Sequence, residues 1–205
     1  MIQARKLLAI AFLFIGFSGG AIFLFLAVTD SPIVPVRATM LPEPRLLPEF
    51  SLTDQHDQRF TRDDLAGQWR LVFFGFTNCP DICPATLQQL AIARRRAMGD
   101  GDAFPGIVLV SVDPERDSPA AMAAYVGNFG DGVTGLTGSI EELMALTRPL
   151  GIYFSKSGDP DGNYSVDHSS VVLLIDDAAN WRAVFSAPHD VDSFVSDVAL
   201  LMDAG

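Results

Sequence analysis

The chain has 205 residues, a net charge of −11 and an apolar content of 49%, which suits one domain with an appendage rather than two full domains. An acidic surface repels phosphate backbones and argues against nucleic acid as a partner. It suits a basic protein partner or a metal cation. Cys79 and Cys83 are the only cysteines, so several disulfides are excluded and the pair forms either a site or one local bridge.

The N-terminal segment is predicted to anchor the protein in a membrane. Leu7–Val28 contains 22 residues without a charge, and about 20 apolar helical residues span a bilayer. A cleavable signal peptide is the alternative, but its apolar region has only roughly 7–15 residues. Arg5 and Lys6 hold the short N-terminus inside, so we expect an anchor at residues 1–30 and export of the rest.

A proline-rich stretch and an α/β domain follow the anchor. Residues 31–48 contain five prolines and predict a stiff, extended tether, which leaves a domain at 49–205. Periodicity and turn signals predict a mixed sheet flanked by helices, in which the strands at 71–76 and 107–112 run parallel. The expected elements are a hairpin at Phe50–Thr61, a strand at Leu71–Phe76, a helix at Pro84–Met98, a strand at Ile107–Val112, helices at Pro119–Phe129 and Ile140–Leu150, a loop at Ser155–Asp167, a hairpin of Val171–Ile175 and Trp181–Ser186, and a helix at Val191–Met202.

The two cysteines follow the first buried strand, at the sheet end where sites gather in such folds. Pro84 fits the first helical position, which makes Cys83 the N-cap and leaves Cys79 in the loop. A helix N-terminus favours thiolate over thiol. Two thiolates with one imidazole suit Cu(I), whereas zinc normally takes a fourth ligand. A structural disulfide is the alternative, although a bridge across three residues would stabilise little.

Three histidines are candidates for a further ligand. His56 lies in a predicted turn and is expected to be exposed, and His189 precedes the last helix, where capping or solvation is the expected role. His168 comes directly before the strand that ends at Ile175. If that strand runs antiparallel to Leu71–Phe76, His168 faces the cysteine loop. A loop histidine with satisfied hydrogen bonds is the alternative interpretation.

Acidic residues surround the predicted site. Asp81 lies between the cysteines, and Asp113, Glu115 and Asp117 form an acidic loop after the second strand. We expect Asp81 to be solvated or to cap the helix, and the acidic loop to be solvated. The alternatives are docking of a partner for all four carboxylates and, for Asp81, a charge that acts beside the metal ligands.

Three blocks of the sequence resemble the Sco/SenC family: FGFTNCPDICP at Phe74–Pro84, SVDPERDSP at Ser111–Pro119 and DHSS at Asp167–Ser170. The resemblance runs from about Leu47 to Leu201. It implies a thioredoxin-like fold and a membrane-tethered copper chaperone, with Cys79, Cys83 and His168 binding Cu(I) or Cu(II). The family delivers copper to, or keeps reduced the cysteines of, the dinuclear copper centre in cytochrome c oxidase subunit II. That subunit, other copper chaperones and thiol reductants are the implied partners.

Other functions remain open at this point. A thiol–disulfide oxidoreductase on the same fold typically has two residues between its cysteines, not three, and does not need His168. A peroxiredoxin-like peroxidase has a threonine three residues before its cysteine, whereas Thr77 is two before Cys79. A membrane-tethered interaction domain with a structural bridge is the non-catalytic alternative.

We therefore predict mainly a metallochaperone, with thiol–disulfide reductase as an additional activity. The short N-terminus has no transit peptide and indicates a bacterium. The expected location is the inner membrane, crossed once, with the domain in the periplasm.

Overall fold

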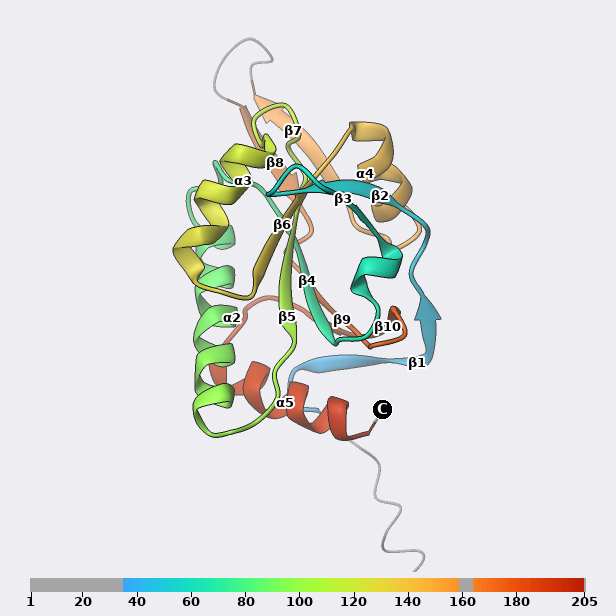
Figure 1. Cartoon of the computed structure of the whole chain (residues 1–205), viewed down its shortest axis with the longest axis vertical. Helices are drawn as coiled ribbons and strands as arrows, with labels where there is room; N and C mark the ends of the chain where they lie inside the picture. Colours follow the sequence, from blue (N-terminus) through green and yellow to red (C-terminus); the bar gives the residue numbers. More distant parts are fainter. Residues whose placement is uncertain (1–34, 159–163, 205) are drawn as a thin grey trace, which may run out of the picture. The chain divides into compact units, whose positions relative to one another are not determined.

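The computed structural model describes residues 35–158 and 164–204 (Figure 1). The membrane anchor predicted at residues 1–30 lies outside these ranges. Among the helices within them, none is both long enough and apolar enough to cross a membrane.

A mixed sheet of eight strands forms the centre of the described domain. Its strands are β1 (Ala38–Leu46), β2 (Ser51–Asp54), β3 (Arg59–Thr61), β4 (Arg70–Gly75), β5 (Gly106–Ser111), β6 (Val133–Thr137), β9 (Val172–Ile175) and β10 (Asn180–Phe185). They lie in the order β1-β10-β9-β4-β5-β6-β2-β3, and β4–β5 and β5–β6 are the parallel pairs. The predicted parallel pairing of the strands at 71–76 and 107–112 is confirmed.

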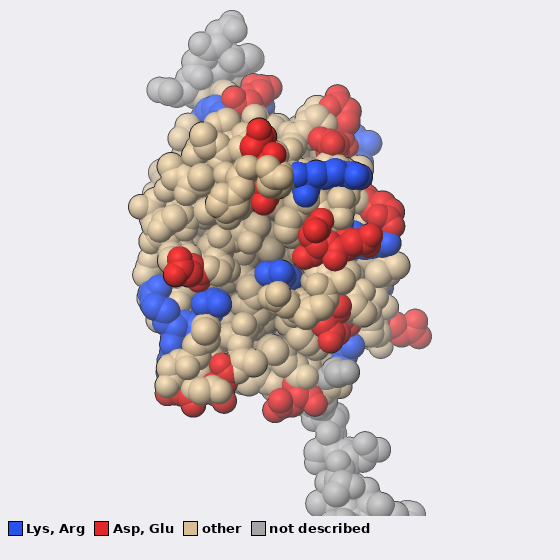
Figure 2. Space-filling view, in the orientation of Figure 1, with Lys and Arg blue, Asp and Glu red and all other residues tan. Residues whose placement is uncertain are grey.

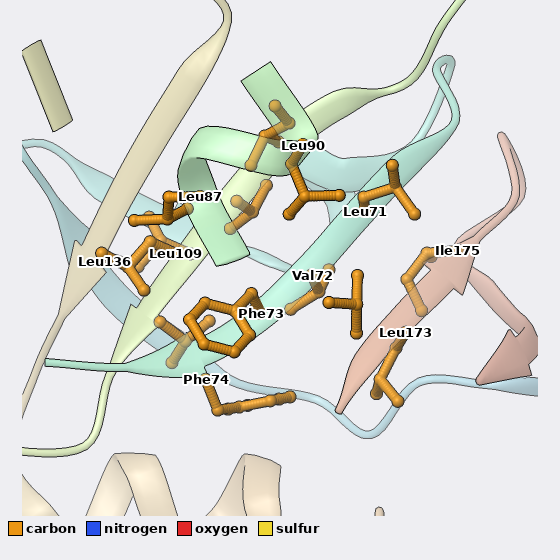
Figure 3. Close-up of a cluster of buried hydrophobic side chains, with 14 of the residues drawn as sticks. Leu71, Val72, Phe73, Phe74, Leu87, Leu90, Leu109, Leu136, Leu173 and Ile175 are labelled. Atoms are coloured by element: carbon orange, nitrogen blue, oxygen red, sulfur yellow. The ribbon is translucent and has the colours of Figure 1, made fainter. Parts of the chain in front are cut away.

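Helices cover both faces of this sheet (Figure 1). They are α2 (Ile82–Gly99), α3 (Pro119–Val126), α4 (Ile140–Thr147) and α5 (Val191–Asp203), with short 3-10 turns η1 (Arg62–Leu65) and η2 (Gly127–Phe129). Successive side chains of a strand point to opposite faces. In β4, Leu71 therefore packs toward Leu90 of α2, and Val72 and Phe74 point to the other face (Figure 3). Leu146 of α4 lies with them on that face. The central strands are buried on both sides, which explains their continuous apolar runs.

The first strand corrects the predicted tether. Residues 38–46 pair with β10, so the folded domain begins before Glu49. The buried carboxylate of Asp197 in α5 accepts hydrogen bonds from the backbone N–H groups of residues 36, 37 and 38, at 2.8, 2.7 and 2.9 Å, and holds this segment on the domain. Pro42 and Pro44 fall where the register shifts between Met40 and Arg45, an irregularity that an edge strand tolerates.

Two further strands replace a predicted loop. Phe154–Gly158 (β7) and Tyr164–His168 (β8) pair antiparallel within the segment expected to be irregular, and residues 159–163 between them are outside the described part. Most side chains of these two strands are exposed or half-buried, and Val166 is the one that is buried. Polar residues and glycine can therefore occupy the strands, and the alternating apolar pattern of a half-buried strand is missing. β6 was missing from the prediction because Gly135 and two threonines interrupt its apolar pattern.

Candidate metal centre

The cysteines lie where β4 leads into α2. The helix begins at Ile82 with Asp81 as its N-cap, so Cys83 lies in the first turn and the predicted N-cap position was wrong. Pro84 still fits, because N–H groups in the first turn have no partner within the helix. The side chain of Asp81 makes no capping hydrogen bond. Instead, Cys79 Sγ accepts from the backbone N–H of Cys83 at 3.4 Å and so orders the loop against the helix end.

Cys83 is the more deeply placed of the two thiols. Its exposed fraction is 0%, against 9% for Cys79. A Cβ atom at Gly75 would lie 2.9 Å from Cys83 Sγ, so the glycine leaves room for the sulfur at the end of β4. Burial raises the pKa of the Cys83 thiol, and the hydrogen bond with Cys79 raises it further. The effect of desolvation on this pKa thus outweighs that of the helix N-terminus, so the preference for thiolate predicted from the sequence does not hold for Cys83. A metal ion that binds Cys83 has to displace the thiol proton.

His168 ends β8 and directs its Nε2 atom at the cysteines. Nε2 lies 3.4 Å from Cys83 Sγ, and Nδ1 lies 3.1 Å from the carbonyl oxygen of Ser169. Because a carbonyl only accepts, this hydrogen bond places the proton on Nδ1 and leaves the Nε2 lone pair facing the sulfurs. Burial lowers the pKa of His168, although the bond to Ser169 acts in the opposite direction. The ring is therefore neutral at neutral pH, the form that binds metals.

The structure brings the three predicted residues together. One ligand atom from each of Cys79, Cys83 and His168 lies within 4.8 Å of the other two. Phe73 and Phe76 contact the imidazole edge-on, at centroid distances of 6.1 and 5.8 Å. The antiparallel pairing of β9 with β4, on which the predicted approach of His168 depended, is confirmed.

A surface cleft of 320 Å³ opens onto this group. Cys79 and His168 line it, whereas Cys83 lies behind them. Asp81 and Asp167 are exposed on its rim, so the predicted solvation of Asp81 is confirmed. The cleft therefore leads to Cys79 and His168 past two exposed carboxylates.

The other two histidines lie apart from the ligand group. His56 is exposed in the turn between β2 and β3, as predicted. His189 donates from Nε2 to the carbonyl oxygen of Ser170 at 2.9 Å and stacks on Phe194. Asp190, not His189, is the N-cap of α5. The capping or solvated role predicted for His189 was wrong, because the turn into α5 folds its ring onto the domain.

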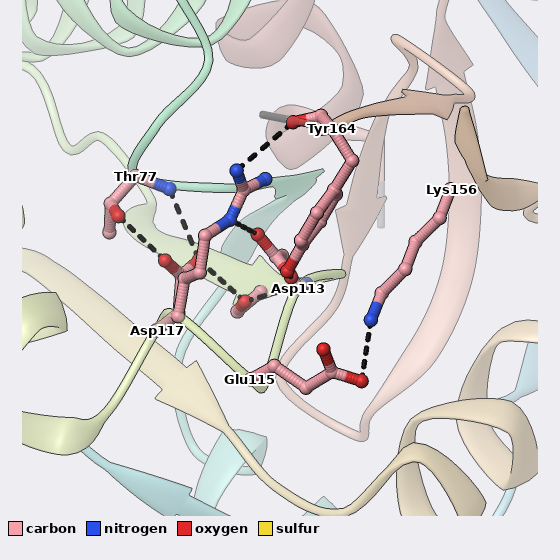
Figure 4. A network of polar contacts seen from close by, with 8 residues as sticks. Thr77, Asp113, Glu115, Asp117, Lys156 and Tyr164 are labelled. Carbon is pink, nitrogen blue, oxygen red and sulfur yellow. Dashed lines mark hydrogen bonds and ion pairs between the residues drawn. The ribbon is translucent and has the colours of Figure 1, made fainter. Parts of the chain in front are cut away.

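Two residues of the predicted acidic loop are buried rather than solvated. Asp113 and Asp117 each have an exposed fraction of 0%. Asp117 accepts from the N–H and the hydroxyl of Thr77 at 3.1 and 2.6 Å and from the hydroxyl of Ser111 at 2.6 Å (Figure 4). Buried carboxylates are tolerated when donors surround them. Asp117 thereby ties the loop after β5 to the cysteine loop.

Asp113 makes the second buried connection, toward the hairpin. It accepts from Arg116 Nε and, at 2.7 Å, from the hydroxyl of Tyr164 in β8 (Figure 4). Of the predicted acidic loop, Glu115 is exposed and pairs with Lys156 of β7 at 2.5 Å. Sequence reasoning missed Arg116 and Tyr164 as residues near the site. Arg116 stands in a block that carries the family resemblance, which was a usable signal, whereas Tyr164 was assigned to a loop.

Comparison with known proteins identifies the relationship. The SCO1/SenC family model matches residues 38–203. The chain belongs to this family. "Protein SCO1 homolog 1, mitochondrial" of Arabidopsis thaliana is 39% identical over 149 residues, which are 73% of this chain but 45% of that protein. The "SCO2-like protein" of Rickettsia felis is 30% identical over 93% of this chain and 95% of its own length.

A solved Sco structure agrees with the fold. The crystal structure of Arabidopsis thaliana ScoI with copper bound superimposes with a TM-score of 0.73 and 37% sequence identity, over 78% of this chain and 99% of that one. The thioredoxin-like α/β fold predicted for this chain is thereby confirmed. The N-terminal residues of this Sco protein lie outside its described structure.

Proposed function

We propose that this Sco protein binds one copper ion through Cys79, Cys83 and His168. The observation that carries the proposal is the convergence of their three ligand atoms within 4.8 Å, two of them from residues that line one cleft. Two sulfurs and one imidazole nitrogen are soft and borderline donors, which suit copper. The Nδ1–H hydrogen bond to Ser169 fixes the tautomer that binding requires.

The spacing of the donors fits a single ion. With bonds of about 2.0–2.3 Å to nitrogen and sulfur, ligand atoms around a trigonal ion lie about 4 Å apart. The distances between the ligand atoms, from 3.4 Å for Cys83 Sγ and His168 Nε2 up to no more than 4.8 Å, therefore have to change by less than about 1 Å to reach bonding geometry. A trigonal set suits Cu(I) better than zinc, which normally completes a tetrahedron.

We further propose that the bound copper is cargo for the dinuclear copper centre of cytochrome c oxidase. The cleft supports transfer, because an acceptor's thiolates can reach the ion past Cys79 and His168 while the buried Cys83 stays behind. Asp81 and Asp167 on the rim would attract a cation and a basic patch on a partner. The proposed partners are subunit II of the oxidase, another copper chaperone as donor and a thiol reductant.

Thiol–disulfide exchange is a second function that one observation favours. Both cysteines are free thiols whose sulfurs belong to the same tight group. A partner's disulfide entering the cleft would meet Cys79 first, and Cys83 would then resolve the mixed disulfide. Reduction of the acceptor's cysteines and delivery of copper can thus share one site.

A copper titration tests the main proposal. The reduced full-length chain in detergent is expected to bind one Cu(I) per chain, because the described residues contain one such group of three ligands. Oxidation to the Cys79–Cys83 disulfide should abolish tight binding, since thiolates are required. The measurement is anaerobic competition against a Cu(I) chelator of known affinity. Tight binding of two ions per chain, or by the oxidised chain, would contradict the site.

The proposed location is a bacterial inner membrane, with an anchor at residues 1–30 and the domain in the periplasm. The mature protein is expected in the membrane fraction, with the domain digested by protease in cells stripped of their outer membrane, because Arg5 and Lys6 favour an inside N-terminus. Cell fractionation and protease accessibility measure this. A shortened, freely soluble form would indicate a signal peptide, and protection of the domain would reverse the orientation.

A further inference from the structure

The hairpin that carries His168 is not part of the main sheet. β7 and β8 pair with each other in a separate two-stranded sheet. An isolated two-stranded hairpin is marginally stable in water. Its position on the domain, and with it the position of His168, therefore depends on side-chain contacts.

One partly buried group of side chains supplies several of these contacts, in addition to the Lys156–Glu115 ion pair and the packing of Val166. Asp113, Arg116 and Tyr164, called the clasp below, join the loop after β5 to the first residue of β8. The Tyr164 hydroxyl donates to Asp113 Oδ1 at 2.7 Å, Arg116 Nε donates to Asp113 Oδ2, and Arg116 Nη1 donates to the Tyr164 carbonyl at 3.0 Å (Figure 4). Asp113 is fully buried, so its charge is compensated by these donors rather than by water.

The clasp also reaches the cysteine side of the site. The Arg116 guanidinium carbon lies 3.8 Å from the Tyr164 ring centroid and 5.7 Å from that of Phe76. Phe76 follows β4 and contacts the His168 ring edge-on. Arg116 thus lies against two aromatic rings, one from the hairpin and one from the segment before Cys79.

Strand geometry connects Tyr164 to His168. They lie four residues apart in β8, so their side chains point to the same face. Val166, between them on that face, is 4% exposed. Because β8 is extended, hydrogen-bonded at Tyr164 and buried at Val166, these two residues fix the position of the His168 side chain relative to the thiols.

We propose that the clasp positions His168 for copper, so that Tyr164 and Arg116 act on the metal site through the hairpin without touching the ion. This inference rests on the proposed copper function. When the clasp is weakened, the hairpin spends less time against the cysteine loop. The apparent copper affinity then falls in proportion to the fraction of molecules in which His168 is in place.

The test is a double-mutant cycle between Tyr164→Phe and His168→Ala in the full-length chain. Tyr164→Phe removes one hydroxyl and keeps the ring, and we expect Cu(I) affinity to fall about tenfold, since a hydrogen bond to a charged group is lost. In the His168→Ala background the same change is expected to have no further effect. In the metal-free protein, amide hydrogen exchange of residues 154–158 and 164–168 is expected to accelerate in Tyr164→Phe.

Tyr153→Phe is the matched control, because this tyrosine is 61% exposed beside the start of β7. It is expected to leave affinity and exchange unchanged. Wild-type affinity of Tyr164→Phe, or an equal loss in both backgrounds, would overturn the positioning role while leaving the copper site intact. Unchanged affinity of His168→Ala would overturn the ligand assignment and this inference with it. An equal effect of Tyr153→Phe would also overturn it, since any change in the hairpin would then suffice.

Discussion

Replacing Cys83 with serine is expected to lower Cu(I) affinity at least about a hundredfold, because a tight site distributes roughly 10–16 kcal/mol over its ligands. Serine keeps the size of the side chain but supplies a hard hydroxyl that does not ionise at neutral pH. Cys79→Ser should have an effect of the same order, since each change leaves one sulfur and one imidazole. Chelator competition with the reduced full-length chain measures both.

The control for Cys83→Ser is Ala93→Ser. Ala93 lies on the same helix and is 0% exposed, so this change also buries a hydroxyl in the core but removes no sulfur. It is expected to reduce the free energy of unfolding while copper affinity stays at the wild-type level. Tight one-to-one binding that survives either cysteine substitution would show that the ion is held elsewhere.

Replacing His168 with alanine is expected to weaken Cu(I) binding about a hundredfold, since one of three ligands is removed from a partly buried site. The reduction potential of the Cys79–Cys83 pair should change much less, because disulfide exchange requires an attacking and a resolving thiolate but no imidazole. In cells the variant should impair assembly of the oxidase copper centre, with partial rescue by added copper. Parallel measurements of copper affinity and reduction potential therefore separate chaperone from oxidoreductase.

His56→Ala is the appropriate control for His168→Ala, because His56 is exposed and is not one of the three grouped ligands. His189→Ala is less suitable, since its ring donates to the Ser170 carbonyl in the segment between β8 and β9. If only the cysteine variants lose copper and His168→Ala behaves like His56→Ala, the thiol–disulfide function becomes the better explanation. Full copper affinity with loss of cellular function would show that His168 serves a partner rather than the ion.

Short stretches of the sequence were enough to predict two central strands, one helix and the position of the cysteines. The apolar runs of β4 and β5, the helical spacing after Pro84 and the two cysteines at the end of a buried strand depend on interactions between residues near one another in the chain. Such patterns place the first half of the site at the sheet end where parallel strands terminate. The resemblance of three sequence blocks to the Sco/SenC family then indicated His168 as the third ligand.

The tertiary structure decided how distant segments complete the site. His168 and Cys83 are 85 residues apart and meet because β9 runs back beside β4 and the hairpin before β9 packs on the domain. Asp113 and Asp117 look like a solvated acidic loop in the sequence, and they are buried because donors from the cysteine loop and from β8 surround them. The raised pKa of Cys83 likewise follows from its burial, which sequence position at a helix start does not reveal. Side chains that take their partners from remote elements leave no periodic signal, because their energies depend on contacts that exist only in the folded chain.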